Sequence, residues 1–418
     1  MKVFKKITIM ALSLSIFLVS CQGGNSSMNT LNTEKSSEDD NNIAVESTEE
    51  TSKKIKETTA VPENPYEREI KQASIWTKDF DDADHSIKGI ENIRTVGLIT
   101  GDGSENKTRT RFRVGGTDLG IPVIHNEQMY LWFGDTFWGD RFGKPMEGGL
   151  WRSNVLAISN DTDFSDGLSI DDMIGDGEKD KKYARELVES LKIPGTEHTV
   201  IPTGSVSIDG KLYVYFMSIK AWGTPGRWTI NYGGLAVSHD NGETFEKLED
   251  FKLNPDKFGQ FAAILVDDYV YGIGIGGGRF GNAYLARVKQ NEIENLDAYE
   301  YLVAVEEGKP VFDKDSEKSM PIIKDTVGEP SIMWNEYLQE YVITYFKESH
   351  ASIIMRTAKE LWAPYSEYLV LASGGDFPAL YGGFVHERMT KDNGKTFYYI
   401  MSMWDPVYNA ILMEVTLK

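Results

Sequence analysis

The sequence predicts an all-β fold, a five-bladed β-propeller, and three observations lead to that prediction. Apolar and aromatic runs alternate with short Asp, Asn and Gly turns along most of the chain. A unit of apolar strand, tight turn and aromatic-rich strand recurs, and its five copies begin at Asp118, Gly204, Gln260, Glu329 and Gly383. Radial repetition of such units leaves few exposed strand edges, which is typical of a propeller. A two-sheet sandwich is the alternative, but it does not require five similar hairpins.

Each copy carries the signals of a β-hairpin, and most copies continue into a third strand. In the first copy, a turn near His125–Glu127 separates the strand that starts at Asp118 from the strand that ends before Asp135. We expect third strands at Ser153–Ile158, Gly234–Ser238, Ala283–Val288 and Ser352–Thr357. An N-terminal strand near Ile93–Thr100 should pair beside Ala410–Thr416 and close the last blade.

Residues 161–200 form a long insertion in the first blade. Within it, the spacing of Tyr183, Leu187 and Leu191 predicts a helix over Asp180–Lys192. Long loops on a rigid scaffold often carry function. We therefore expect this helical insertion to form a wall or lid beside the site.

The N-terminal residues predict a lipoprotein signal peptide over residues 1–20. Lys2, Lys5 and Lys6 form a basic start, and an apolar run from Ile7 follows that is too short to span a bilayer comfortably. The run ends in Leu-Val-Ser before Cys21, the chain's single cysteine, in the pattern of a lipobox. We expect Cys21 to carry a lipid that anchors the chain to a membrane of the cell envelope, with the domain outside the cytoplasm. The alternative is an ordinary secretory signal with an incidental cysteine.

Composition divides the rest of the chain into a tether and a domain. Residues 21–66 are rich in Ser, Thr, Asn, Glu and Asp, so we predict a disordered tether there. The globular domain then covers residues 67–418, and we expect it to be monomeric. The formal net charge of -20 argues against nucleic acid as a partner. The single cysteine excludes an intramolecular disulfide and Cys-rich metal sites, and no motif for a cofactor or metal is recognised.

Three carboxylates stand out among the starts of the predicted inner strands and their neighbours. Asp118 opens the first strand of the first hairpin and Asp135 closes the second, in Gly-Thr-Asp and Gly-Asp-Thr. Antiparallel pairing brings these two ends together, and neighbouring strands lie about 4.8 Å apart. Two carboxyl groups that flank one bond are what glycoside hydrolysis requires. Glu329 opens the fourth blade and is a third candidate catalytic acid. Turn or capping roles for these residues remain open.

Aromatic and planar polar side chains near strand ends favour carbohydrate recognition, although core or surface roles are equally open for several of them. The predicted substrate-binding residues are Trp138, Arg152, Asn154, Trp222, Arg279, Asn282 and Tyr381. Sugar rings stack on aromatic faces, and amide and guanidinium groups hydrogen-bond to hydroxyls. We therefore expect a polysaccharide or oligosaccharide as the substrate.

The motifs Gly115–Gly120, Phe133–Phe137 and Arg152–Asn154 resemble those of a family described as a domain of unknown function. Members of that family are recognised as endo-D-arabinanases, five-bladed propeller glycoside hydrolases that act on D-arabinofuranose polymers. The resemblance covers most of residues 90–418 and implies that Asp118 and Asp135 are the catalytic acids.

The leading hypothesis is a surface-anchored glycoside hydrolase that cleaves a furanoside-containing, arabinan-like polysaccharide internally through a carboxylate pair. A non-catalytic carbohydrate-binding propeller is the second hypothesis, and it predicts binding without release of reducing ends. A sialidase-like exo-enzyme is the third, because Ser238–Phe245 and Thr390–Phe397 look like Asp-box turns. That chemistry requires an arginine cluster, which is not evident in the sequence.

Overall fold

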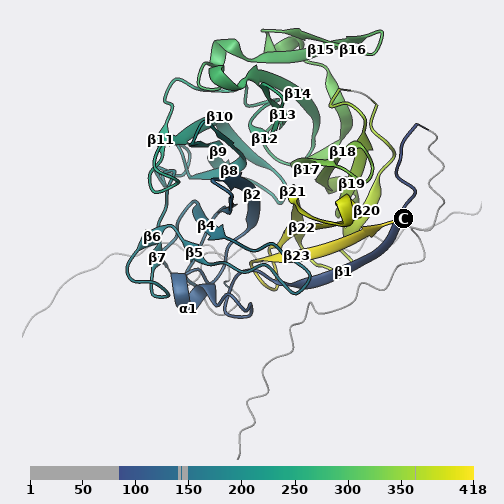
Figure 1. The fold of residues 1–418 in the computed structure, drawn as a ribbon. Coiled ribbons are helices and arrows are strands. Elements are labelled where there is room, and N and C mark those ends of the chain that lie inside the picture. The colour runs from purple at the N-terminus through teal and green to yellow at the C-terminus, as the bar shows by residue number, and fades with distance from the viewer. Residues whose placement is uncertain (1–83, 140–142, 144–148, 363) are drawn as a thin grey trace, which may run out of the picture. The chain divides into compact units, whose positions relative to one another are not determined.

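The computed structural model describes residues 84–139, 143, 149–362 and 364–418 of the chain (Figure 1). The predicted signal peptide, Cys21 and the tether lie outside the described residues. Strands dominate the described part, where the α-helix is α1 (Thr108–Phe112). Single 3-10 turns occur at Gln290–Glu292, Leu296–Ala298, Ser316–Lys318, Glu348–His350 and Asp392–Gly394. The predicted all-β class is confirmed.

The first two repeats each form a four-stranded antiparallel sheet. One sheet has the order β2-β3-β4-β5, with β2 at Leu119–His125, β3 at Gln128–Phe133, β4 at Val155–Ser159 and β5 at Asp172–Met173. The other is β8-β9-β10-β11, with β8 at Thr199–Ile208, β9 at Lys211–Trp222, β10 at Trp228–Ser238 and β11 at Glu246–Lys247. Between them, β6 (Gly175–Asp176) and β7 (Tyr183–Ala184) form a small separate pair.

The third and fourth repeats are joined in one sheet through pairing of β14 with β17. The third repeat contributes β12 (Gln260–Val266), β13 (Tyr269–Ile275) and β14 (Gly281–Lys289), with the hairpin β15 (Glu300–Glu306) and β16 (Lys309–Asp313) beside β14. The fourth contributes β17 (Pro321–Asn335), β18 (Glu340–Lys347), β19 (Ser352–Ala358) and β20 (Leu369–Ser373). The third strands predicted at Ala283–Val288 and Ser352–Thr357 are present as β14 and β19.

The last sheet is closed by the N-terminal strand, as predicted. Its order is β1-β23-β22-β21, with β1 at Ile90–Leu98, β21 at Leu380–Lys391, β22 at Thr396–Met403 and β23 at Asn409–Leu417. Strand β1 pairs antiparallel with β23, and Ile93 lies opposite Val415. Residues from both ends of the domain therefore complete one sheet.

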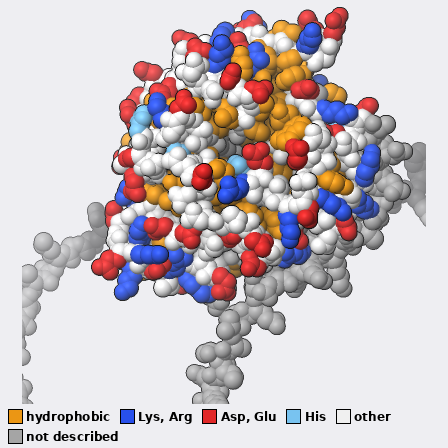
Figure 2. Space-filling view, viewed as in Figure 1, with side chains coloured by type: hydrophobic (Ala, Val, Ile, Leu, Met, Phe, Trp, Pro, Cys, Tyr) orange, Lys and Arg blue, Asp and Glu red, His pale blue; other side chains and the backbone are white. Residues whose placement is uncertain are grey.

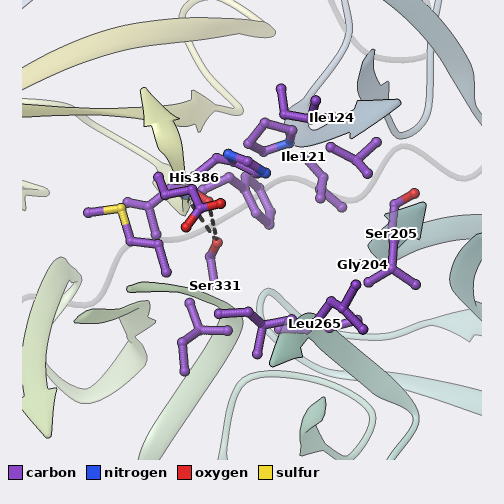
Figure 3. Close-up of a pocket in the computed structure, with 18 of the residues that line it drawn as sticks. Ile121, Ile124, Gly204, Ser205, Leu265, Ser331 and His386 are labelled. Carbon is purple, nitrogen blue, oxygen red and sulfur yellow. Dashed lines mark hydrogen bonds between the residues drawn. The ribbon is translucent and has the colours of Figure 1, made fainter. Parts of the chain in front are cut away.

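The strands β2, β8, β12, β17 and β21 lie next to one another in that order, and β21 also contacts β2, so the five form a ring (Figure 1). Hydrogen bonds join neighbouring inner strands. The Phe261 amide of β12 donates to Thr203 Oγ1 of β8 (3.2 Å), and the Val385 amide of β21 donates to Ser331 Oγ of β17 (3.1 Å). The ring encloses a cavity of about 750 Å³, with Ser331 and His386 on one side and Gly204 on the other (Figure 3).

Apolar side chains fill the spaces between neighbouring sheets and hold the ring together. Trp132 of β3, Phe216 of β9 and Tyr399 of β22 belong to one buried cluster that runs through several sheets. Burial of apolar surface is the main favourable contribution to such packing. On the face drawn in Figure 2, hydrophobic side chains gather over β14, β17 and β18, and the centre of the ring is hollowed.

The helix predicted over Asp180–Lys192 is wrong, since the structure contains no helix there. The amides of Leu187 and Val188 donate to Asn154 Oδ1, at 3.1 and 2.9 Å. Both of these adjacent side chains are buried, whereas Leu191 is 60% exposed, so burial does not follow helical spacing. An isolated helix of this length is marginal in water, and here two adjacent backbone amides donate to Asn154 Oδ1 in a bent, non-helical segment.

Candidate functional site

The hairpin of β2 and β3 brings Asp118 and Asp135 to the same end of the sheet. Asp118 directly precedes β2, and Asp135 follows β3 after one glycine. Leu119 pairs with Phe133, and the Gly134 amide donates to the Asp118 carbonyl oxygen at 3.2 Å. The hairpin geometry predicted from the sequence is therefore confirmed.

The small residues beside the two aspartates fix the spacing between their backbones. A Cβ atom added to Gly134 would lie 2.4 Å from Asp118 Oδ1, so this glycine leaves the room that the Asp118 carboxyl occupies. The hydroxyls of Thr117 and Thr136 are hydrogen-bonded to each other at 2.6 Å and link the two motifs. The Gly-Thr-Asp and Gly-Asp-Thr patterns thus have a direct structural reason.

The surroundings of Asp118 favour its protonated form. The Tyr381 hydroxyl donates to Asp118 Oδ2 at 2.8 Å, while Oδ1 is buried and has no hydrogen-bond partner among the described residues. Burial raises the pKa of Asp118 to about 7, and the charges of Asp135 and Glu329 add to the rise against hydrogen bonds from Tyr381 and Tyr408. Asp118 can therefore hold a proton near neutral pH.

Asp135 has better support for a negative charge. The Trp151 indole N–H and the Thr199 hydroxyl both donate to its Oδ1, at 2.8 and 2.7 Å. Burial raises the pKa of Asp135 to about 6, while these two hydrogen bonds and the charge of Lys192 oppose the rise. The two aspartates thus differ in environment. Asp118 has a buried oxygen, Oδ1, without a hydrogen-bond donor among the described residues, whereas Asp135 accepts two hydrogen bonds on its Oδ1.

Glu329 lies at the start of the inner part of β17 and is joined to Arg279. The Arg279 Nε atom donates to Glu329 Oε1 at 2.7 Å, and Glu329 Oε2 is buried without a partner among the described residues. Glu329 is 7% exposed and has a φ of 39°, an unfavourable backbone conformation that is typical of functional sites. The Arg279 guanidinium lies 4.7 Å from the centre of the Tyr381 ring. Arg279 and Tyr381 therefore connect Glu329 to Asp118.

Irregular pairing occurs near this end of four inner strands. The register shifts lie between Leu119 and Ile121 in β2, Pro202 and Gly204 in β8, Gly328 and Ser331 in β17, and Gly382 and Phe384 in β21. Such bulges bend a strand and re-aim its side chains, and they are frequent beside active sites. The cavity lining begins beside these positions, and none of the three acids is among its described residues, so the acids lie next to this end of the cavity without lining it.

The other predicted residues divide into two groups. Trp138 and Trp222 are 36% and 45% exposed, and Asn282 is half-buried near the start of β14. Arg152 and Asn154 are buried instead. Arg152 donates to the carbonyls of Ala184 and Arg113, and Asn154 donates to those of Val188 and Val200. In the described part of the chain, Arg152 and Asn154 are not hydrogen-bonded to the three acids. Their side chains hold backbone segments in place instead.

Thr199 and Tyr408 belong to the site but were not predicted from the sequence. Thr199 binds Asp135 from the start of β8, ahead of Gly204, where the repeat was taken to begin. Tyr408 reaches Asp118 from the segment before β23. No local motif marks either residue. A prediction that placed the start of β8 at Thr199 rather than at Gly204 would have included this residue.

Within the described ranges, no group of three or more His, Cys, Asp or Glu side chains has an arrangement suited to a metal ion. The same part of the chain contains no helix with the length and apolar character needed to cross a bilayer.

Comparisons with known proteins place the chain by fold and family. It is similar to the structure of a protein from Bacteroides ovatus ATCC 8483 that its description assigns to the hydrolases, with 11% identity, a TM-score of 0.51, and coverage of 77% of this chain and 87% of that one. It also matches Zg3597, a family 117 glycoside hydrolase of Zobellia galactanivorans (12% identity, TM-score 0.46, 80% and 92% covered). A GH43_1 enzyme from Xanthomonas citri matches at 13% identity (TM-score 0.43, 72% and 87% covered).

No curated protein matches the sequence. A family model does, over residues 103–414, which include all three acids and the ring of inner strands. The chain belongs to this family, the domain of unknown function DUF4185.

Proposed function

We propose that this protein is a glycoside hydrolase with a five-bladed β-propeller fold. The main support for the proposal is a pair of carboxyl groups in different environments, Asp118 and Asp135, which lie at adjacent strand ends of one hairpin. The ring of five inner strands supports the blade number. Titratable pairs whose environments differ are the general sign of an acid and a base that act together.

Asp118 is the general acid in the proposed reaction. Its carboxyl group gives its proton to the glycosidic oxygen as the bond from that oxygen to the anomeric carbon breaks. A pKa of about 7 leaves this carboxyl protonated in about half of the molecules at neutral pH. Tyr381, hydrogen-bonded to Oδ2, holds the carboxyl in position and stabilises the charge that remains after transfer.

Asp135 supplies the negative charge on the other side of the bond. As a base it accepts a proton from the water that attacks the anomeric carbon, and as a nucleophile it attacks that carbon itself. The separation of the two carboxyls in a substrate complex distinguishes inversion from retention. Glu329, held by Arg279, contributes a negative charge that raises the pKa of Asp118.

A furanoside-containing, arabinan-like polysaccharide that is cleaved internally is the proposed substrate. The motifs around Asp118 and Asp135 resemble those of endo-D-arabinanases, and exposed Trp138 and Trp222 suit stacking against sugar rings. By their descriptions, Zg3597 is a family 117 glycoside hydrolase and the Xanthomonas citri protein is a GH43_1 enzyme. A digestion screen tests the proposal, with arabinan and arabinogalactan among the polysaccharides and the Asp118→Asn variant as control. Binding without release of reducing ends from any polysaccharide would favour the carbohydrate-binding alternative.

We further propose that Cys21 anchors the domain to the cell envelope through a lipid. The lipobox-like pattern before the single cysteine supports this location. Metabolic labelling with a radioactive fatty acid tests it: the native chain should incorporate label and fractionate with membranes. The Cys21→Ser variant should do neither. Equal labelling of both proteins would exclude Cys21 as the attachment site.

A further inference from the structure

Two exposed tryptophans lie on the rim of the site. Trp404 is 53% exposed and directly follows β22, whose last residue Met403 pairs with Leu380 at the start of β21. Trp222 is 45% exposed and ends β9, close to the pairing of Ile219 with Thr199 at the start of β8. Both indoles therefore lie at the end of the ring where Asp118 and Asp135 lie.

Each exposed indole packs against a second ring that contacts the acid cluster. Trp404 meets Tyr408 edge to face at 5.4 Å between centroids, and Tyr408 is hydrogen-bonded to Asp118. Trp222 meets Trp228 in the same way at 5.5 Å. The Trp228 ring lies 5.4 Å from the Arg279 guanidinium, which binds Glu329. Edge-to-face packing favours one orientation of a ring. The Trp404 and Trp222 indoles are therefore held in place by the rings beside them.

The two indoles lie on opposite sides of the catalytic hairpin. In the ring of inner strands, β2 has β21 as one neighbour and β8 as the other. Trp404 belongs to the sheet of β21, and Trp222 belongs to the sheet of β8. Along the ring, the shorter path between the two indoles crosses the segment of β2 and β3 that carries Asp118 and Asp135.

We propose that Trp404 and Trp222 bind two sugar residues of one neutral polysaccharide chain, one on each side of the bond that is cleaved. This inference rests on the proposed function and assigns the two residues that hold the polysaccharide on either side of the cleaved bond. Indole rings offer large apolar faces at little entropic cost, which suits the C–H faces of sugars. Three carboxylates beneath and a net charge of -20 disfavour a polyanionic chain.

Binding is measured first, in the full chain carrying Asp118→Asn so that no probe is consumed. The probes are arabinan, arabinogalactan, xylan, galactan and inulin, with polygalacturonate as the polyanion, in affinity electrophoresis. Trp404→Ala and Trp222→Ala should each weaken binding of the neutral polymer by about 3- to 10-fold or more, as expected for loss of an aromatic contact. The double variant should bind more weakly than either.

The matched control is Tyr337→Ala. Tyr337 is 43% exposed but lies in the turn between β17 and β18, at the opposite end of these strands. Its removal should leave affinity unchanged. The inference fails if no probe binds, if the tryptophan variants bind as Tyr337→Ala does, or if polygalacturonate binds best.

Product lengths from the active enzyme give a second readout. On an end-labelled oligosaccharide of the bound polymer, Trp404→Ala and Trp222→Ala should shift the cleavage position in opposite directions. Shifts in the same direction would place both sugars on one side of the bond. Indole-dependent binding with no cleavage by the native protein would contradict the proposed hydrolase and leave the binding platforms in place.

Discussion

Replacement of Asp118 by Asn should slow turnover strongly and, at neutral pH and above, stabilise the fold. Burial raises the pKa of Asp118 from 3.8 to about 7 in the folded protein. The folded state therefore binds more protons than the unfolded chain between about pH 4 and pH 7. Stability falls as the pH rises through this window, and the loss persists above pH 7. A neutral Asn removes this pH-dependent cost.

The magnitude follows from the size of the shift. A shift of about three pKa units corresponds to about 4 kcal/mol of unfolding free energy, at about 1.4 kcal/mol per unit. The Asn amide would keep the Tyr381 hydrogen bond but place a donor at the buried, unpartnered Oδ1 position, which costs about 1–3 kcal/mol. This second cost is the same at every pH, so it cancels when two pH values are compared.

Urea unfolding at pH 4 and pH 8 measures the effect. The stability of Asp118→Asn relative to the native protein should increase by up to about 4 kcal/mol from the lower to the higher pH. Asp209→Asn, at an exposed aspartate in the turn between β8 and β9, serves as control and should show little pH dependence. An equal difference at both pH values, or a larger benefit at pH 4, would refute the proposed environment of Asp118.

Three further predictions follow from the same geometry. Activity should peak between about pH 6 and pH 7, because Asp118 must keep its proton and Asp135 must lose one; a flat profile of kcat/KM from pH 5 to 9 would argue against this pair. Gly134→Ala should lower kcat strongly because its Cβ would lie 2.4 Å from Asp118 Oδ1, while Gly97→Ala, where the added atom meets nothing within 4 Å, should not. Arg279→Met should destabilise the fold by about 3–5 kcal/mol, since buried Glu329 would lose its ion-pair partner; thermal or urea unfolding checks this, and an unchanged stability would contradict it.

Much of the fold could be predicted because the hairpin signal is local. Alternating apolar strands and Asp/Asn/Gly turns located the inner strands, and the pairing of β1 with β23 followed from the need to close the last sheet. The aspartate pair could be predicted for the same reason, because both residues belong to one hairpin. The predicted helix failed because a spacing pattern carries no information about Asn154, whose side chain binds the backbone of the insertion.

The rest of the site depends on contacts between distant segments. Tyr381 and Tyr408 reach Asp118 from the last sheet, and Thr199 reaches Asp135 from the second. Arg152 belongs to one of the three motifs that resemble the family, yet its guanidinium donates to backbone carbonyls. Side-chain direction decides these outcomes, and local sequence patterns do not reveal it.

The central claim is that Asp118 and Asp135 together cleave a glycosidic bond. The most direct measurement is release of new reducing ends from polysaccharides by the native protein, Asp118→Asn, Asp135→Asn and the Asp209→Asn control. The native protein and the control should release oligosaccharides from at least one neutral polysaccharide, and each site variant should be slower by about 10²-fold or more. Comparable release by either site variant, or no release by the native protein from any polysaccharide that it binds, would contradict the claim.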